Sequence, residues 1–311
     1  MKQQIVKQFL EAGVLLTPEA LSQITEKSAE MILEQARREG SLVFSLQEKE
    51  QKPLIEARKF QKKQKFTAQE LAKYYNTRFE GIKAMLEKKM EGLVSVSNSK
   101  KSLAPISTIG MVSERTQRGF IIEDLTGQAE IITKSEEAQP DDVIGVKGHV
   151  KEGKIFADEI IWPDVPMTHK NSCLETTIIF AEKDIHKGEF VITPEAVFGP
   201  DKKKADLPDP GWISIEKDNR HATVLVYSPG RAVSQKEAFS WLKRRHLSPE
   251  RAQIRSTDDP FLIEPIPDIV WIVNPEKWTE SYKGVIIVAS DGSQASMVDL
   301  ERGTVAFKEQ I

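Results

Sequence analysis

Hydrophobic positions follow a helical period in the first hundred residues and an alternating period beyond them. An N-terminal helical module is predicted at residues 1–46, where Ile5, Phe9 and Leu10 share one helical face. A second helical segment is predicted at residues 67–101, because it opens with a Thr-x-x-Glu capping box and then keeps apolar residues at helical spacing. The chain therefore begins with two helical regions before any β-structure.

The alternating pattern starts near Ser102 and predicts a β-domain at residues 102–166. Glycines and Asp/Pro pairs mark its bends, and five short strands with such bends are typical of an OB-type barrel. The predicted strands are Thr108–Val112, Phe120–Glu123, Glu130–Thr133, Val143–Val150 and Ile155–Ile161.

Residues 167–311 mix strands with a helix and predict a sandwich of α+β type. Residues 190–222 have turns and charges but little periodicity, which is compatible with a loop. The expected fold class is thus α+β and multidomain. The predicted strands are Ala222–Tyr227, Ile269–Val273, Gly284–Ala289, Ala295–Leu300 and Thr304–Lys308, with a helix over Gln235–Arg245.

Composition narrows the class of protein. The 311 residues are 39% hydrophobic and 29% charged, and no apolar run approaches the roughly 18 residues of a membrane span. The N-terminus has no signal-peptide pattern, and the single cysteine, Cys173, excludes an intramolecular disulfide framework. We therefore expect a soluble, cytoplasmic protein. Its net charge of −3 gives no global attraction to nucleic acid, so any contact with DNA must be local.

Residues 47–66 form a basic linker. From Lys49 to Lys65, seven basic residues face two acidic ones. The segment can be a solvated linker or a tether that contacts phosphates. In the second case the candidates for DNA contact are Lys59, Lys62, Lys63 and Lys65.

The first helix also matches, loosely, the spacing used by sliding-clamp ligands. Gln3, Val6, Phe9 and Leu10 stand at the positions of glutamine and apolar anchors in such ligands, although leucine replaces the second aromatic residue. Plain amphipathic packing is the alternative interpretation. A sliding clamp is therefore a possible partner.

A β-branched run from Thr176 leads into Asp184-Ile185-His186. Carboxylate oxygen and neutral imidazole both suit Mn²⁺, Fe or Zn²⁺, and a strand that delivers the two groups is how binuclear phosphoesterases present their first ligands. The pattern is short, and an acid and a histidine at a strand end also occur by chance. A structural role for Asp184 and His186 is the alternative.

Several ordered blocks carry a family resemblance. They are Phe9–Leu21, Phe66–Leu86, Ile109–Val112, Ile122–Gly127, Asp142–Gly148, Trp162–Pro166, Arg244–Pro249 and Ile266–Val270. Through these blocks the chain resembles the small-subunit family of the archaeal family D DNA polymerases. The resemblance implies a helical N-terminus, an OB domain and a calcineurin-like phosphoesterase domain. It also implies a 3′ to 5′ proofreading exonuclease that uses two metal ions.

The ligand motifs of that family are largely missing. Asp184 and His186 stand at its first D-x-H, but no G-D-x-x-D or G-N-H-D motif follows, and only 38 positions lead from His186 to Val224. The family's Y-H-G-R block reads Tyr-Ser-Pro-Gly-Arg at 227–231, and Asn274 and Glu276 stand at the two histidines of its G-H-x-H block. We therefore expect a shortened, degenerate phosphoesterase sandwich in which Asp184 and His186 are relics and no metal or other cofactor is bound.

Four residues within or next to these blocks are candidates for subunit contact. These candidates are Arg244, Arg245, His246 and Trp271. The resemblance implies an accessory, structural subunit in DNA replication, whose partner is the large catalytic subunit and which meets DNA through the complex.

Two other functions compete with this one. A residually active nuclease would use a Mn²⁺ pair held by Asp184, His186 and unrecognised ligands such as Asp258, Asp259 or Asp291. A stand-alone single-strand DNA-binding protein would use the barrel. The barrel has few aromatic residues that we expect to be exposed (Phe120, Phe156 and Trp162) and many acids, which favours subunit contact.

Overall fold

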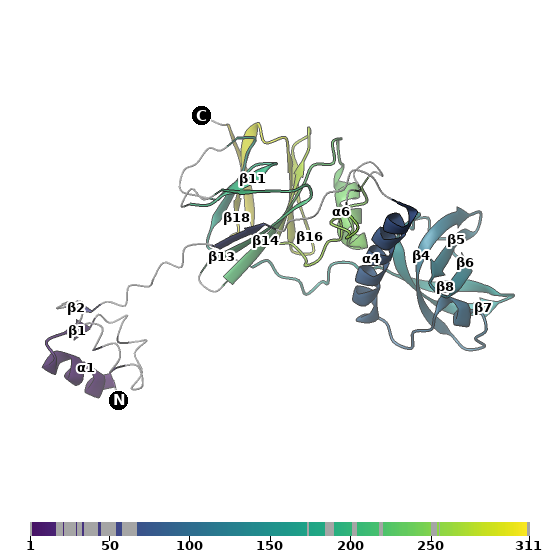
Figure 1. The fold of residues 1–311 in the computed structure, drawn as a ribbon, viewed down its shortest axis with the longest axis horizontal. Coiled ribbons are helices and arrows are strands. Elements are labelled where there is room, and N and C mark those ends of the chain that lie inside the picture. The colour runs from purple at the N-terminus through teal and green to yellow at the C-terminus, as the bar shows by residue number, and fades with distance from the viewer. Residues whose placement is uncertain are drawn as a thin grey trace. The chain divides into compact units, whose positions relative to one another are not determined.

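The computed structural model of the chain contains two compact units, Met1–Lys52 and Pro53–Ile311 (Figure 1). The residues that it describes are 2–16, 21, 29, 33, 43–44, 54–57, 67–172, 174–183, 190–200, 204–217, 220–249, 254 and 256–309. Within these ranges, no helix combines the length and the apolar character that a bilayer crossing requires.

The first unit has a small core of its own. Helix α1 (Lys2–Glu11) packs Ile5 and Phe9 inward, and β1 (Leu15–Leu16) pairs in parallel with β2 (Val43–Phe44). Leu10, which we predicted on the same face as Ile5 and Phe9, is 54% exposed. The prediction for Leu10 was wrong, because one further residue turns the side chain about 100° from Phe9 around the helix.

The second unit opens with strand β3 (Leu54–Ala57) and the long helix α4 (Ala68–Glu87). The predicted capping box is present, since Thr67 accepts a hydrogen bond from the Glu70 backbone and Glu70 accepts one from the Thr67 backbone. One face of α4 is buried, and it includes the charged Arg78 among apolar neighbours. The short helix α5 (Val96–Ser99) follows and packs on the barrel.

Five strands close into a barrel in the order β4-β5-β6-β8-β7, which confirms the predicted five-stranded barrel. Its strands enclose an apolar core, and Val112, Phe120 and Ile131 are among the fully buried residues of that core. Gly119 is required at its bend, because a Cβ there would lie 2.0 Å from the Ile131 carbonyl oxygen. The strands are β4 (Ile106–Thr116), β5 (Gly119–Asp124), β6 (Gly127–Ile132), β7 (Val143–Lys151) and β8 (Lys154–Ile161).

Two six-stranded sheets make the rest of the unit, here called the sandwich. One sheet has the order β12-β11-β10-β9-β18-β19 and the other β16-β17-β15-β14-β13-β3. The strands of the first are β9 (Thr177–Phe180), β10 (Phe190–Ile192), β11 (Ala196–Phe198), β12 (Lys204–Asp206), β18 (Gln294–Asp299) and β19 (Thr304–Glu309). Those of the second, besides β3, are β13 (Gly211–Lys217), β14 (Arg220–Tyr227), β15 (Ile269–Val273), β16 (Trp278–Tyr282) and β17 (Val285–Ser290).

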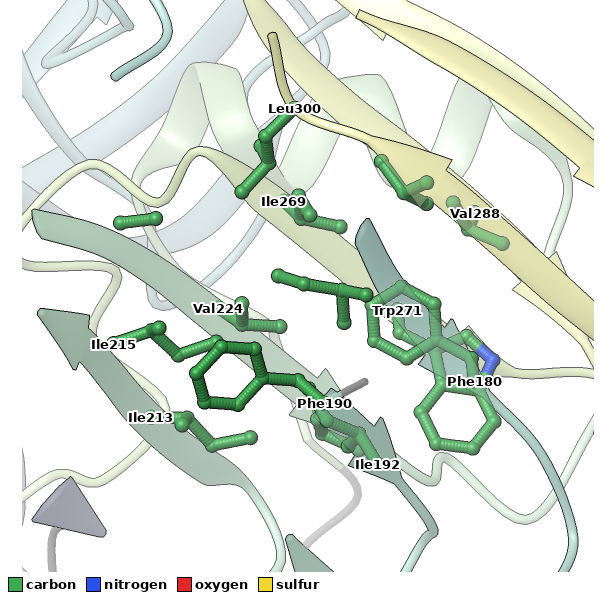
Figure 2. Packing of buried hydrophobic residues seen from close by; sticks show 14 of the residues in the cluster. Phe180, Phe190, Ile192, Ile213, Ile215, Val224, Ile269, Trp271, Val288 and Leu300 are labelled. Carbon is green, nitrogen blue, oxygen red and sulfur yellow. The ribbon is translucent and has the colours of Figure 1, made fainter. Parts of the chain in front are cut away.

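Apolar side chains from both sheets meet in one core (Figure 2). Phe180 of the first sheet packs on Trp271 of the second, with ring centroids 4.9 Å apart. The other face of the second sheet is covered by helix α6 (Gln235–Arg244), whose Trp241 packs edge-on against Tyr227. Strands such as β15 are therefore buried on both faces.

Two segments differ from their predicted state. Residues 190–222, which we interpreted as a loop, contribute β10 to β13 and part of β14. The basic linker contains β3, which pairs antiparallel with β13, Leu54 opposite Glu216 and Ala57 opposite Ile213. Part of the linker is thus a strand of the sandwich. The short Leu-Ile-Glu-Ala stretch pairs with β13, although basic residues flank it.

Candidate functional site

Metal ligands of the resembled family are expected where the sandwich strands end, and Asn274 directly follows β15. The side-chain oxygen of Asn274 accepts a hydrogen bond from the Val233 backbone at 2.7 Å, and its side-chain nitrogen donates to the Glu276 carbonyl at 2.7 Å. Its backbone N–H donates to the Ser290 carbonyl. Only 1% of the residue is exposed. Asn274 is therefore bonded to residues 233, 276 and 290, and both heteroatoms of its side-chain amide have a backbone partner.

The end of β9 is closed by the turn between β17 and β18. The Glu182 backbone N–H donates to the Gly292 carbonyl at 2.9 Å. Gly292 has a positive φ of 80°, and a Cβ there would lie 2.6 Å from the Glu182 nitrogen, so only glycine allows this approach. Because the two backbones pack so closely, little room is left at this point for a carboxylate that bridges two metal ions.

The end of β14 carries the altered Tyr-Ser-Pro-Gly-Arg block. Tyr227 is buried against Trp241 and Phe261, and the Ser228 backbone donates to the Asp209 carboxylate at 3.0 Å. Arg231 forms an ion pair with Glu237 of α6. Each of these contacts connects the block to other parts of the same sandwich.

These strand ends do not assemble a recognisable metal site from the residues that the structure describes. Across those residues, no three His, Cys, Asp or Glu side chains gather closely enough to hold a metal ion. Asp184 and His186 lie outside the described residues, so their predicted role stays a prediction. Asp291 bonds to Ser293 in its own turn, and these hydrogen bonds lower the pKa of its carboxyl group.

Arg244, a predicted subunit contact, joins α6 to the barrel. Its Nε lies 3.0 Å from the Asp142 carboxylate, and its guanidinium also donates to the Glu137 carbonyl. Burial raises the pKa of Asp142 to about 6, although Arg244 opposes the shift. Next to this pair, Lys243 lies 2.5 Å from the Glu137 carboxylate. The junction between α6 and the β6–β7 connection is therefore ionic.

His246 belongs to a buried group of four side chains, here called the ionic cluster: Tyr74, Arg78, His246 and Asp259. Arg78 lies 3.0 Å from one Asp259 oxygen and donates to the Tyr74 hydroxyl at 2.7 Å. His246 Nε2 lies 2.8 Å from the same Asp259 oxygen, and its Nδ1 accepts a hydrogen bond from the Ser248 backbone. The cluster connects α4 to the segment after α6.

The hydrogen bonds fix the protonation of this cluster. Because Nδ1 of His246 is an acceptor, the imidazole is neutral with its proton on Nε2. In agreement, burial lowers the pKa of His246 below its ordinary value of 6.5, against the opposing charge of Asp259. Burial alone would raise the pKa of Asp259, but its contacts with His246 and Arg78 keep it below the ordinary value. The cluster is thus a satisfied buried network rather than an open acid–base site.

The other predicted contact residues lie inside the fold. Trp271 has no exposed surface and donates its indole N–H to Ser290. Arg245 is 6% exposed, donates to the Ile263 carbonyl, and burial lowers the pKa of its guanidinium to about 10. His246 is 4% exposed. That these residues contact a partner stays a prediction, although their side chains present almost no surface.

The aromatic residues of the barrel also differ from expectation. Phe120 is fully buried and Trp162 is 9% exposed, so the prediction that they are exposed was wrong. Phe120 lies on the inward face of β5, and the guanidinium of Arg244 lies over the ring of Trp162. Phe156 is half-buried and stacks on His149.

The two remaining partner predictions concern the N-terminal part of the chain. Lys59, Lys62, Lys63 and Lys65 lie outside the described residues, so DNA contact by the linker stays a prediction. Phe9, an apolar anchor of the possible clamp motif, is 1% exposed within the core of the first unit.

A second junction, which the sequence did not reveal, holds the segment Trp162–Pro166 between barrel and sandwich. The Lys89 ammonium donates to the carbonyls of Trp162, Pro163 and Asp164, and burial lowers the pKa of this lysine. The Asp164 carboxylate accepts from the Tyr282 hydroxyl and pairs with Lys283. Asp164 and Asp142 both belong to blocks that carry the family resemblance, which is the signal that could have found them.

No protein-family model matches the chain. Three curated archaeal relatives are each named DNA polymerase II small subunit. The protein of Archaeoglobus fulgidus is 27% identical over 125 residues, which cover 37% of this chain and 25% of the relative. That of Methanothermobacter thermautotrophicus is 27% identical over 171 residues, covering 47% and 35%.

The third relative, from Thermoplasma acidophilum, is 26% identical over 211 residues, which cover 59% of this chain and 43% of the relative. The matched segments thus span less than half of each relative. The chain is similar to archaeal DNA polymerase II small subunits over part of their length.

Proposed function

We propose that the chain is an accessory, structural subunit of an archaeal D-type DNA polymerase, without exonuclease activity of its own. The similarity to three DNA polymerase II small subunits supports a role as a replication polymerase subunit. Its partner would be the large catalytic subunit, and it would meet DNA through the complex.

The observation that carries the non-catalytic part of this proposal is Asn274. It stands where the resembled family has a metal-binding histidine, and both ends of its side-chain amide are bonded to backbone groups. An amide neither titrates near neutral pH nor replaces imidazole as a proton relay. Gly292 and Asp209 close the neighbouring strand ends in a similar way.

The short interval after the D-x-H motif supports the same proposal. A two-metal nuclease brings several carboxylates, histidines and an asparagine together around the ion pair. Val224 lies 38 positions after His186, and the described residues of this interval include β10 to β13 and the start of β14. The interval thus builds sheet in place of the ligand loops that the resemblance implies.

The contacts between barrel and sandwich suit a scaffold. Arg244 pairs with Asp142, Lys89 holds the connecting segment, and Arg78 pairs with Asp259. Ion-paired side chains that also form hydrogen bonds fix the relative position of the elements that they join. A partner that binds this unit would therefore meet a barrel and a sandwich that are already connected.

The test is to purify the chain alone and together with the large subunit of an archaeal D-type polymerase. We expect a stable complex, no retained Mn²⁺ by metal analysis, and no Mn²⁺-dependent shortening of a 3′-labelled oligonucleotide in either state. Failure to form any complex would overturn the subunit assignment. Mn²⁺-dependent cleavage that Asp184→Ala abolishes would overturn the non-catalytic assignment and support the residual nuclease instead.

A further inference from the structure

Strand β16 forms one edge of the second sheet of the sandwich. It pairs with β17 on one side, and none of the strands that the structure describes lies on its other side. Its three central residues, Thr279, Glu280 and Ser281, are exposed. Natural sheet edges are commonly protected by proline, lysine or a bulge, and β16 has none of these. The strand is therefore open to pairing along its outer side.

The sheet register shows which backbone groups of β16 point outward. The Ile286 N–H donates to the carbonyl that precedes β15, so Ile286 bonds toward β15 and the next residue, Ile287, bonds toward β16. Ile287 stands opposite Glu280. Because bonding directions alternate along an antiparallel pair, the N–H and C=O groups of Thr279 and Ser281 point away from β17. These two residues thus offer donors and acceptors to another strand.

A cavity of about 780 Å³ adjoins the end of β16, on the sheet face that α6 covers. Tyr282 of β16 and Phe239 of α6 both line it, and their ring centroids lie 5.3 Å apart. Both residues are half-buried, so aromatic surface is available in the cavity. Side chains that stand opposite each other on neighbouring strands lie about 5 Å apart on the same face. A residue paired opposite Tyr282 would therefore place its side chain at this cavity.

The charges around the cavity favour a neutral side chain at that position. Most of them are already in ion pairs, which are Lys243–Glu137, Arg244–Asp142 and Arg231–Glu237. The two other charges of the lining, Lys236 and Glu136, have opposite signs and no ion-pair partner among the described residues. A charged side chain would meet a like charge as well as an opposite one, whereas a neutral aromatic ring packs on Phe239 and Tyr282.

We infer that β16 is a docking edge for an extended segment of a partner polypeptide, which adds a strand at Thr279–Ser281 and places a neutral aromatic side chain beside Phe239. The outward backbone groups require a strand, and the cavity requires the aromatic side chain, so both observations point to the same occupant. A second copy of this chain is disfavoured, because two β16 strands paired about Glu280 would set two carboxylates opposite each other. The inference goes beyond the proposed function and does not rest on it.

The experiment is a titration of the full, isotope-labelled chain with the peptide acetyl-Thr-Ser-Thr-Phe-Thr-Ser-Thr-amide, followed through the backbone amide signals. We expect saturable shifts of the Thr279 and Ser281 signals and none in β19, an edge of the other sheet. Alanine in place of the peptide's phenylalanine should weaken binding about fivefold, because the ring contacts are lost. Methylation of every backbone nitrogen of the peptide should abolish binding. Absence of saturable shifts, equal binding of either altered peptide, or equal binding at β19 would overturn the inference.

Ser281→Pro is the decisive variant, because an edge strand tolerates proline where the N–H points to solvent. It removes one outward donor and sets a ring in the path of the added strand, so binding should weaken about tenfold. Ser281→Thr keeps the N–H and is the matched control, with an affinity within about twofold of the unaltered chain. Urea unfolding checks the fold of both variants, and if Ser281→Pro is unstable, the methylated peptide decides the same point. Unchanged binding by a folded Ser281→Pro chain, or dimerisation of the unaltered chain that Ser281→Pro abolishes, would contradict the assignment.

Discussion

At the scale of single residues, Asn274 shows how one side chain closes the end of a sheet. Its oxygen and nitrogen bond to backbone groups of residues 233 and 276, which lie 41 and 2 positions away. Because the residue is 1% exposed, water does not readily replace either bond. A neutral imidazole also has one donor and one acceptor, but they point in other directions than those of an amide. Asparagine therefore fits these two backbone partners better than a histidine would.

Asn274→Ala should lower the free energy of unfolding by about 2–4 kcal/mol, because it leaves a buried N–H and a buried carbonyl without partners. Urea unfolding measures this change. Asn98→Ala is the control, since Asn98 is exposed in α5, and we expect its effect to stay within about 0.5 kcal/mol. A loss for Asn274→Ala no larger than that of the control would show that the amide does not hold these segments.

At the scale of elements, the ionic cluster joins α4 to the segment after α6. His246 is neutral in the fold, whereas in the unfolded chain it takes up a proton as the pH falls through 6.5. The unfolded state then binds more protons, so the chain loses stability as the pH falls. Asp142 acts in the opposite direction, because its pKa is raised to about 6 and the folded state takes up its proton first.

A comparison with His246→Gln separates these two effects, since Asp142 is present in both chains. Between pH 7 and pH 5 the unaltered chain should lose more unfolding free energy than the variant, by no more than about 2 kcal/mol. Urea unfolding at several pH values measures the difference. If both chains lose the same amount, His246 ionises within the fold and the tautomer assigned from the Ser248 contact is wrong.

Sequence patterns predicted the barrel strands and also the longer apolar runs of β14, β15 and β17. The five barrel strands, which combine buried and partly exposed positions, were all predicted. Residues 190–192, in contrast, are buried at every position, and prolines interrupt the strands that follow. A short strand covered on both faces has no alternation to read. Strand β3 was missed because it has only four residues within a basic stretch.

The candidate site was less predictable, because it depends on contacts between distant segments. Arg78 could have been found, since it is a charged residue on the apolar face of α4. Its partner Asp259, 181 positions away, could not. Trp271 was predicted at a partner surface, but it lies between the two sheets, where β15 is covered from both sides.

At the scale of the second unit, the barrel is inserted into the sandwich. Strand β3 precedes α4 and the barrel in sequence, yet it pairs with β13, which follows them. The chain thus forms an edge of the sandwich, builds α4 and the barrel, and returns to complete both sheets. The barrel is covalently connected to the sandwich on both sides, in addition to its ionic junctions.

The chain 58–311, which lacks β3, tests this arrangement against the chain 53–311, which keeps it. Loss of the backbone pairing over Leu54–Ala57 should lower the free energy of unfolding by about 1–3 kcal/mol. It should also leave the backbone of β13 at a sheet edge, so amide hydrogen exchange there should accelerate while exchange in the barrel strand β5 stays unchanged. Because the two chains differ only by five residues, the comparison isolates the strand. Equal protection of the β13 amides in both chains would mean that β3 does not pair with this sheet.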